Sequence, residues 1–235
     1  MIASSLLVLS LLGADTLLPA EVTENGSPRT SAFELRLGGF KPLIDREASL
    51  TGHPYEEVFG AGAMLLAEIE LERQLWQRFG SVAVGASVGY AEKYGAARDS
   101  AGNPASERTA LKVAPLKLLG IYRFDYAALR WNIPLVPYVK AGLAYTPWWT
   151  TKGGQLEFVD GKRSAGGQWG YVGTLGLSLQ LDFFEPRLAR DFASDMGVNH
   201  SYLFAEYVYQ DVNDFGAAGP DMSSRHWMFG LTLEY

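Results

Sequence analysis

Apolar and polar residues alternate at a period of two in eight segments of the chain. In the second segment, Leu65 and Ile69 share one face, whereas Glu68 and Glu70 lie on the other. Successive side chains of a strand point to opposite faces, so each segment predicts a β-strand with one apolar face. The eight predicted strands span 32–40, 59–72, 81–90, 109–124, 136–145, 171–183, 201–210 and 226–235.

The fourth segment breaks the alternation once. Its apolar face includes Leu111 and Val113 and then moves to Leu116 and Leu118, with Pro115 between the two pairs. Proline cannot donate a hydrogen bond to a neighbouring strand, and inside a closed sheet it is tolerated at a bulge. We therefore predict a β-bulge at Pro115, which would turn the following residues onto the other face.

The connections between the predicted strands alternate in length. Long polar connections follow the odd-numbered strands, and shorter or more structured ones follow the even-numbered strands. The last even connection contains a predicted amphipathic helix that closes at Gly197. Such alternation is expected when all odd strands run toward one side of a membrane and all even strands return. The long connections are 41–55, 91–108, 147–168 and 211–224, and the others are 73–80, 125–134 and 183–199.

The second face of the strands separates two classes of all-β protein. A water-soluble sandwich would carry many Lys, Glu and Asp residues there. Here this face is rich in Gly, Ser, Thr and Ala with isolated charges, which is typical of a barrel interior, while the apolar face suits lipid. The pattern predicts an eight-stranded antiparallel transmembrane β-barrel over 32–235, with a short periplasmic helix. A soluble β-barrel or sandwich is the alternative.

Aromatic residues gather near the predicted strand ends. Amphipathic rings favour both interfaces of a membrane, so these residues are predicted to form a belt near the rim that carries the long loops. The predicted interface aromatics are Tyr90, Tyr145, Trp148, Trp149, Trp169 and Trp227.

Composition excludes several other classes. The chain is 48% hydrophobic and 20% charged, which excludes a disordered protein. A net charge of −6 without a basic stripe gives no reason to expect a nucleic-acid partner. The absence of cysteine excludes disulfides, thiol catalysis and thiolate zinc sites. Beyond residue 20, no apolar run reaches the roughly 18 residues of a membrane-spanning helix.

The N-terminus resembles an export signal. An apolar core from Leu6 to Leu12 is followed by the small residues Gly13, Ala14 and Ala20, although no Lys or Arg precedes the core. This arrangement predicts a secretory signal peptide over 1–20, cleaved after Ala14 or Ala20. Residues 21–31 are predicted to form a flexible leader.

The polar face contains most of the charged residues of the predicted strands. Glu68, Glu70 and Glu72 stack on one strand beside Arg36 of the neighbouring strand, and like charges this close require cations nearby. Eight strands leave an interior that side chains can fill. We therefore predict an interior network of ion pairs, with a narrow cation-preferring pore as the alternative because carboxylates outnumber basic groups. The predicted network comprises Glu34, Arg36, Glu68, Glu70, Glu72, Lys117, Lys140, Asp182, Glu206 and Glu234, with Arg123 added if Pro115 marks a bulge.

The three histidines do not indicate catalysis. His200 and His226 begin strands at opposite ends of the predicted barrel, and no strand face combines a nucleophile, a base and an orienting group. We predict no enzymatic activity, no cofactor and no metal. A barrel enzyme that modifies lipid is a weaker alternative, as is a metal site at the rim between His53 and His226.

The final residues "GLTLEY" are similar to the C-terminal signal of bacterial outer-membrane barrels, through Gly230, Leu233 and Tyr235. The whole pattern over 32–235 resembles OmpA-type and OmpX-type barrels. Three stretches resemble predicted outer-membrane barrels of myxobacteria, a group without an established activity: "LRLGGFKPLID", "PLKLLGIYRFDYAALRWNIPLVPYVKAGL" and "GVNHSYLFAEY".

The resemblance implies a monomer in the outer membrane of a Gram-negative cell envelope. Its surroundings would be the lipid bilayer and lipopolysaccharide. The barrel-assembly machinery would be its partner during biogenesis. The implied role is structural or one of surface interaction.

Overall fold

The computed structural model describes residues 30–47, 50–98, 104–131, 133–159, 161–184, 186–217 and 219–235. The predicted signal peptide over 1–20 and nearly all of the predicted leader over 21–31 lie outside the described residues.

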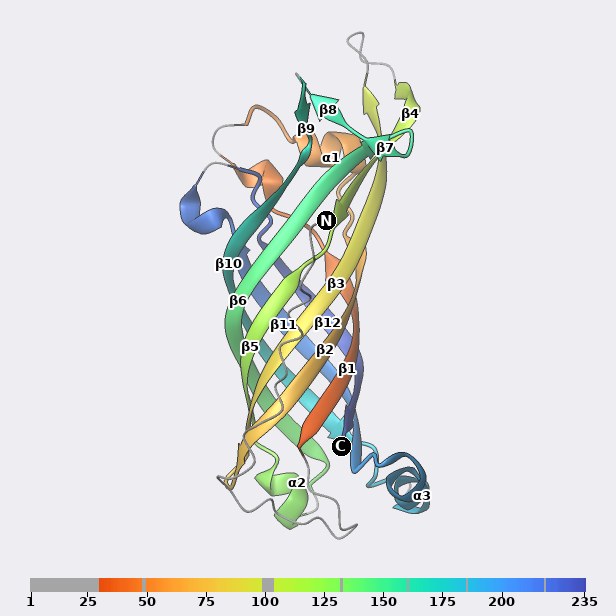
Figure 1. Cartoon of the computed structure of the whole chain (residues 1–235), viewed down its shortest axis with the longest axis vertical. Coiled ribbons are helices and arrows are strands. Elements are labelled where there is room, and N and C mark those ends of the chain that lie inside the picture. The colour runs from red at the N-terminus through yellow and green to blue at the C-terminus, as the bar shows by residue number, and fades with distance from the viewer. Residues whose placement is uncertain are drawn as a thin grey trace, which may run out of the picture.

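The described chain forms a closed antiparallel β-barrel (Figure 1). Neighbouring strands pair in chain order, and β12 returns to pair with β1, where Leu35 lies opposite Leu231. β4 and β5 both pair with β3 and with β6, so they are successive parts of one wall strand and the ring has eight strands. The wall consists of β1 (Ser31–Phe40), β2 (Met64–Gln77), β3 (Ser81–Arg98), β4 (Pro104–Val113), β5 (Leu116–Arg123), β6 (Leu135–Lys152), β10 (Ala165–Gln180), β11 (His200–Val212) and β12 (Ser224–Glu234).

The predicted bulge at Pro115 is wrong. Val113 pairs with Ala91 of β3 and Leu116 with Val88, so both strands advance by three residues and the register is unchanged. The strand is interrupted between β4 and β5 because Pro115 lacks the N–H that the ladder requires. Its carbonyl still accepts a hydrogen bond from Gly89 N at 2.8 Å.

The inward face of this wall strand is continuous across the interruption. Leu111 and Val113 are buried inside the barrel, on the same face as Lys117, whereas Leu116 and Leu118 are exposed on the outside. The sequence suggested a slip because the interior itself becomes apolar near the long-loop end, so that apolarity stops marking the outer face.

The start of the second strand also differs from its prediction. β2 begins at Met64, whereas Phe59, the first residue of the predicted strand, ends the short helix α1 (Pro54–Phe59). Proline suits the first helical turn because its fixed φ is helical and its missing N–H would have no partner there. Gly60 ends the helix at a φ of 76°, which side chains rarely adopt.

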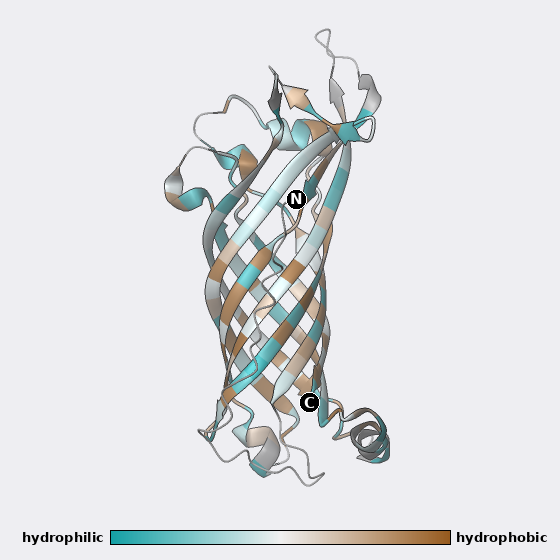
Figure 2. Cartoon of the chain, viewed as in Figure 1, coloured by the Kyte–Doolittle hydropathy of each residue, from teal (hydrophilic) through white to brown (hydrophobic). Residues whose placement is uncertain are grey.

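The two faces of the wall have different chemistry. On β2, Leu65 is 70% exposed on the outside, while the next residue, Leu66, is fully buried inside. Figure 2 shows hydrophobic and hydrophilic residues alternating along the strands of the wall. The outer face is lined by exposed Leu, Ile, Val and aromatic side chains, of which Ile69, Leu71, Val88, Leu118, Val139, Leu143, Leu175, Leu177 and Leu203 are representative.

The two ends of the barrel carry different structures (Figure 1). One end carries the long connections, and the other carries two helices. β3 and β6 have 18 residues each, which at a 40° tilt rise about 45 Å, well above an apolar band of about 25 Å. The wall therefore extends beyond the band at the long-loop end, where α1, η1 (Ile44–Arg46), β7 (Gln155–Leu156), β8 (Phe158–Val159), β9 (Lys162–Arg163) and η2 (Asp214–Gly216) lie.

The opposite end carries α2 (Tyr126–Trp131) and α3 (Pro186–Met196). The helix predicted within 183–199 is confirmed as α3, and Gly197 follows it with a φ of 70°. The sequence analysis did not predict α2. Among the described residues, no helix is both long enough and apolar enough to cross a membrane.

Candidate functional site in the barrel interior

Arg36 of β1 lies at the centre of a buried network of ion pairs. Its guanidinium hydrogen-bonds to the carboxylates of Glu70 on β2 and Glu206 on β11. Glu68 also lies within ion-pair distance, at 3.4 Å. Arg36 is 1% exposed, so these carboxylates compensate the buried guanidinium for the hydration that it loses.

Lys140 of β6 extends the network toward the end that carries α2 and α3. Its ammonium lies 2.6 Å from both Glu34 and Glu70 and 3.3 Å from Glu72. Arg123 of β5 completes this part, because it pairs with Glu72 and lies 2.8 Å from Glu34. These contacts join four strands, β1, β2, β5 and β6, across the interior.

Lys117 of β5 pairs with Glu68 at 2.6 Å and so links the network to the middle of the barrel. Small residues make room for these long side chains. A Cβ at Gly89 of β3 would meet Glu68 Cγ at 2.6 Å, closer than real Cβ atoms approach their neighbours. The glycine on the inner face therefore accommodates the carboxylate that Lys117 and Arg36 share.

Neutral polar residues that were not predicted as site residues complete the network. Tyr138 donates a hydrogen bond to Glu206 at 2.8 Å, and Thr232 donates to Glu34 at 3.1 Å. Gln74 hydrogen-bonds to Glu234. Tyr138 and Thr232 share the inward parity of Lys140 and Glu234 along their strands, and this signal could have identified them.

The interior contains nine of the ten predicted network residues, and Asp182 is the exception. The side chains of the nine are buried, and Arg123 is buried with them although Pro115 makes no bulge. Asp182 follows β10 and lies in the connection to α3. Its placement in the interior network is therefore wrong, because β10 ends two residues before it and the alternation of faces stops there.

Asp182 forms its own cluster at this end of the barrel. His200 Nδ1 lies 2.6 Å from its carboxylate, and Ser201 donates to the same group from its backbone N–H and its hydroxyl at 3.2 and 3.1 Å. Burial alone would raise the pKa of Asp182, but the hydrogen bonds from His200, Gln180 and Ser201 outweigh it and lower the pKa. This cluster fastens the end of β10 to the start of β11.

Three carboxylates of the network are close enough together to share a metal ion. Within the described ranges, Glu34, Glu70 and Glu72 are the one such group, with oxygen atoms within 4.8 Å of one another. Lys140 already lies against all three, so its ammonium occupies the position that a cation would take. The donor set therefore fits a bound lysine better than a bound metal.

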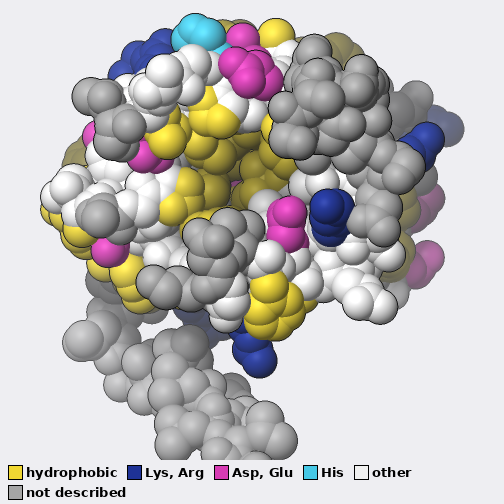
Figure 3. All heavy atoms as spheres, turned by 90° about the horizontal axis from the view of Figure 1, so that it is seen from above, with side chains coloured by type: hydrophobic (Ala, Val, Ile, Leu, Met, Phe, Trp, Pro, Cys, Tyr) yellow, Lys and Arg dark blue, Asp and Glu magenta, His cyan; other side chains and the backbone are white. Residues whose placement is uncertain are grey.

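Toward the long loops the interior becomes apolar. Figure 3 looks onto this end and shows hydrophobic side chains at the centre of the ring. These side chains are almost completely buried, and they fill the barrel between the ion pairs and the long loops. The buried apolar cluster contains Phe40, Tyr55, Met64, Leu66, Leu111, Val113, Ala144, Val172, Val208, Val212, Met222 and Met228, and on one side of the barrel it continues through Ala83, Leu119 and Ile121.

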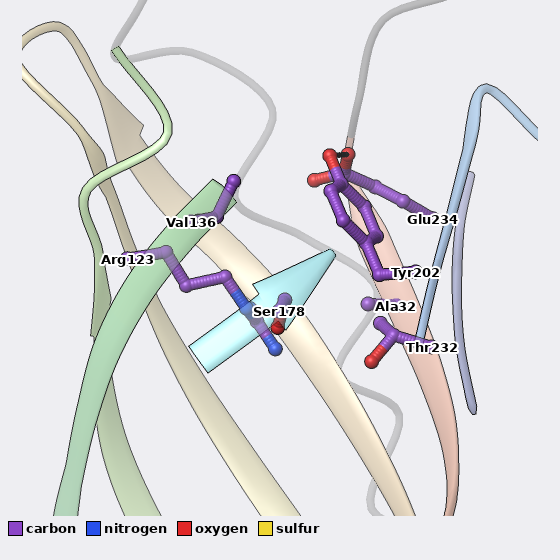
Figure 4. A pocket seen from close by; sticks show the side chains of 7 residues that line it. All are labelled: Ala32, Arg123, Val136, Ser178, Tyr202, Thr232 and Glu234. Carbon is purple, nitrogen blue, oxygen red and sulfur yellow. Dashed lines mark hydrogen bonds between the residues drawn. The ribbon is translucent and has the colours of Figure 1, made fainter. Parts of the chain in front are cut away.

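A small pocket lies at the end that carries α2 and α3 (Figure 4). Arg123 lies on one side of it, and Tyr202 and Glu234 lie together on the other, joined by a hydrogen bond of 3.3 Å. The pocket has room for about one water molecule. The pocket is therefore too small to hold a substrate molecule.

Five of the six predicted interface aromatics pack against another aromatic ring. Tyr90 pairs with Trp149 and Tyr145 pairs with Trp169, with ring centroids 6.4 and 4.7 Å apart. Trp227 packs against Tyr207 at 5.4 Å and is exposed on the outside.

Trp148 differs from these residues, because it packs against the buried apolar cluster. Its prediction as an interface residue is wrong. Two consecutive residues of a strand face opposite ways, so Trp148 and Trp149 cannot both face outward.

The histidines are separated in the structure. His53 precedes α1 in an exposed position, and His226 is buried inside the barrel, with its ring 5.8 Å from that of Phe40. Ser201 donates its hydroxyl hydrogen to Asp182 rather than to His200. The structure therefore supports neither a metal site between His53 and His226 nor a nucleophilic Ser201 with His200 as its base.

The three residues of the predicted C-terminal signal lie on or just beyond β12, the strand that closes the ring. Leu233 pairs with Phe33 of β1, and Tyr235 N donates to Ser31 O at 2.8 Å. Gly230 has a packing role of its own. A Cβ there would collide with Leu35 O and with the ring of Phe204, which lies over the glycine.

Comparison with known proteins places the fold among outer-membrane barrels. No protein-family model and no curated protein matches the sequence. The outer-membrane protein OprG of Pseudomonas aeruginosa is similar in structure, with a TM-score of 0.51 and 14% identity over 88% of this chain and 97% of that one. The fold is therefore an eight-stranded antiparallel β-barrel of the outer-membrane type, as the sequence predicted.

Two further structures match less closely. Neisserial surface protein A has a TM-score of 0.45 at 14% identity, over 87% of this chain and 96% of that one. The N-terminal barrel domain of Pseudomonas aeruginosa OprF has a TM-score of 0.43 at 12% identity, over 88% and 98%. None of these structures tests the narrower resemblance to the myxobacterial group, which stays a prediction.

Proposed function

We propose that this chain is a monomeric integral protein of a Gram-negative outer membrane with a structural or surface-interaction role, closed to solutes by its own side chains. One observation carries the proposal: the outside of the ring is apolar, whereas the ion pairs lie buried inside it. This distribution is the reverse of that in a water-soluble protein, and lipid is the solvent that it suits.

The long loops would face the cell exterior, and α2 and α3 would face the periplasm. Barrels of this type have short periplasmic turns and longer external loops. In the described part of the loop after β1, Asp45 accepts hydrogen bonds from the backbone N–H groups of Tyr55 and Glu56 at 2.7 and 3.0 Å. Lys41 pairs with Glu56 at 2.6 Å beside it. Such a surface would meet lipopolysaccharide.

A heat-modifiability gel tests membrane insertion first. Outer membranes are extracted with detergent, and boiled and unboiled samples are compared. A band that shifts on boiling is expected, because a closed barrel resists unfolding by detergent. Recovery in the soluble fraction with no shift would overturn the proposal and favour a soluble β-barrel.

Orientation can be measured with single cysteines, since the chain has none of its own. Gln155→Cys lies at the long-loop end, and Asp191→Cys lies on α3. On intact cells, a membrane-impermeant maleimide should label the first and spare the second. The opposite labelling would reverse the proposed topology.

A narrow cation-preferring pore is the second candidate. The observation in its favour is the charge balance of the ion-pair network. Among the described residues, the five carboxylates of Glu34, Glu68, Glu70, Glu72 and Glu206 pair with four basic groups. Planar-bilayer recordings separate the two candidates. A closed barrel gives no discrete conductance, whereas a pore gives a cation-selective conductance that changes in Glu70→Gln.

A further inference from the structure

We propose that α3 lies in the headgroup region of the periplasmic leaflet, with one face in contact with lipid, as a second membrane contact beside the barrel wall. This inference rests on the proposed membrane location of the barrel. It adds that an element outside the wall binds the lipid surface.

The exposed side chains of α3 are the first reason. Phe192 and Met196 lie one helical turn apart and therefore share a face. They are 38% and 65% exposed, although both are apolar. Ser194 and Arg187 lie on the other side of the helix, which is strongly amphipathic over its 11 residues. Within the described part of the chain, α3 packs only lightly against the wall, mainly against β11.

Continuity with the barrel wall is the second reason. Leu175 and Leu177 on the outside of β10 are exposed, and Phe183 and Phe184 in the following turn are 54% and 59% exposed. Along the chain, these exposed apolar residues lie between the outer face of β10 and α3. The solvent that covers the wall would therefore also cover the helix.

The direction of the helix is the third reason. Figure 1 looks almost along the axis of α3, which projects sideways beside the end of the barrel and lies across the long axis of the barrel. A helix with this direction at the end of a membrane barrel runs parallel to the membrane plane. Interfacial amphipathic helices lie in this way, with the apolar face toward the acyl chains.

Charge and size decide among the possible occupants. The charged residues Arg187, Arg190, Asp191 and Asp195 sum to zero, so the helix has no preference for an anionic partner. A stable contact with a second copy needs roughly 1,000 Å² of buried surface, which two exposed side chains do not supply. Zwitterionic lipid needs neither charge nor a large interface.

Two single-cysteine variants test the inference. Met196→Cys places a polarity-sensitive fluorophore on the apolar face, and Ser194→Cys places it on the opposite face of the same helix. The whole chain is reconstituted in phosphatidylcholine vesicles with bromine near the top of the acyl chains. We expect a blue shift and loss of emission at position 196, and a water-like, unquenched emission at position 194. Phe192→Cys, one turn earlier, should behave like Met196→Cys.

Several outcomes would overturn the inference. Equal emission at both positions would mean that the helix is simply hydrated. A blue shift at position 196 without quenching would mean that protein covers it, such as a second copy. Tryptophan quenching in the unlabelled chain checks the barrel separately, because Trp169 and Trp227 are exposed on the outside. If these tryptophans are quenched and the helix probe is not, the inference on α3 fails while the proposed function stands.

Discussion

Near α2 and α3 the barrel interior is filled with ion pairs, whereas near the long loops it is filled with apolar side chains. Arg36, Lys140 and Arg123 each contact at least two carboxylates in the first region. In the second region, Phe40, Met222 and their neighbours are uncharged and are buried against other apolar side chains.

The two regions differ in how strictly they determine the register of the strands. An ion pair needs a particular partner at a particular position, and the partners here come from β1, β2, β5, β6 and β11. Apolar side chains need only the right volume. The charged region therefore discriminates between strand registers, and the apolar region mainly seals the barrel. The variants below would break or sharpen this comparison, and they are ordered from the largest expected effect to the smallest.

Arg36→Ala should be the most damaging substitution. It leaves Glu70, Glu206 and Glu68 without their shared cation, and removing one partner of a buried ion pair costs about 3–5 kcal/mol. Urea unfolding in lipid vesicles measures the loss. Arg73→Ala on the outside of β2 is the control, and an exposed site of this kind should change stability by under about 0.5 kcal/mol. Equal losses in the two variants would contradict a network centred on Arg36.

Leu66→Ala tests the apolar region. It leaves a cavity beside Met64 and Met228, and the expected cost is about 3 kcal/mol. Leu65→Ala removes the same atoms from the neighbouring residue that faces outward, so its cost should be clearly smaller. The same unfolding assay compares the two. If Leu65→Ala proved the more harmful, the assignment of faces on β2 would be reversed.

Gly230→Ala tests the contact between the wall and an interior ring. The added methyl group would meet Phe204 and Leu35 O, and such overpacking costs about 1–3 kcal/mol. Gly173→Ala is the matched control, because a Cβ at that position has nothing within 4 Å. The midpoint of the heat-induced gel shift should fall in Gly230→Ala and stay in place in Gly173→Ala. A normal midpoint in both would leave only a role in assembly for Gly230.

Asp182→Asn should have the smallest effect, and this effect should depend on pH. The lowered pKa of Asp182 means that its ionised form is stabilised in the folded state. Its contribution is therefore present at neutral pH and is lost as the pH falls below about 4 through the lowered pKa. Unfolding curves of the variant and the parent chain should differ at neutral pH and converge in acid. A constant difference down to the most acidic pH would show that ionisation of Asp182 does not matter.

Much of the fold followed from alternation alone. On β2, the charged Glu68, Glu70 and Glu72 share one face and the exposed Leu65 and Leu71 the other, as the period of two requires. Helix α3 was also predictable, from its amphipathic pattern and Gly197. Helix α1 was not, because "PYEEVF" is too short to show a helical period and its last residue, Phe59, fits the alternation that leads into β2. The short helix is held by contacts such as Asp45 with the backbone of Tyr55.

The sequence by itself determined that the chain forms eight membrane-length strands with charges on one face, because alternation is a local property. It could not determine which charges meet. Glu34 and Lys140 are more than a hundred residues apart, and only closure of the ring through β1 and β12 brings them to 2.6 Å. The continuous register at Pro115 and the separation of Asp182 from the network were likewise decided by pairing with neighbouring strands. These properties depend on long-range register, which a local pattern does not contain.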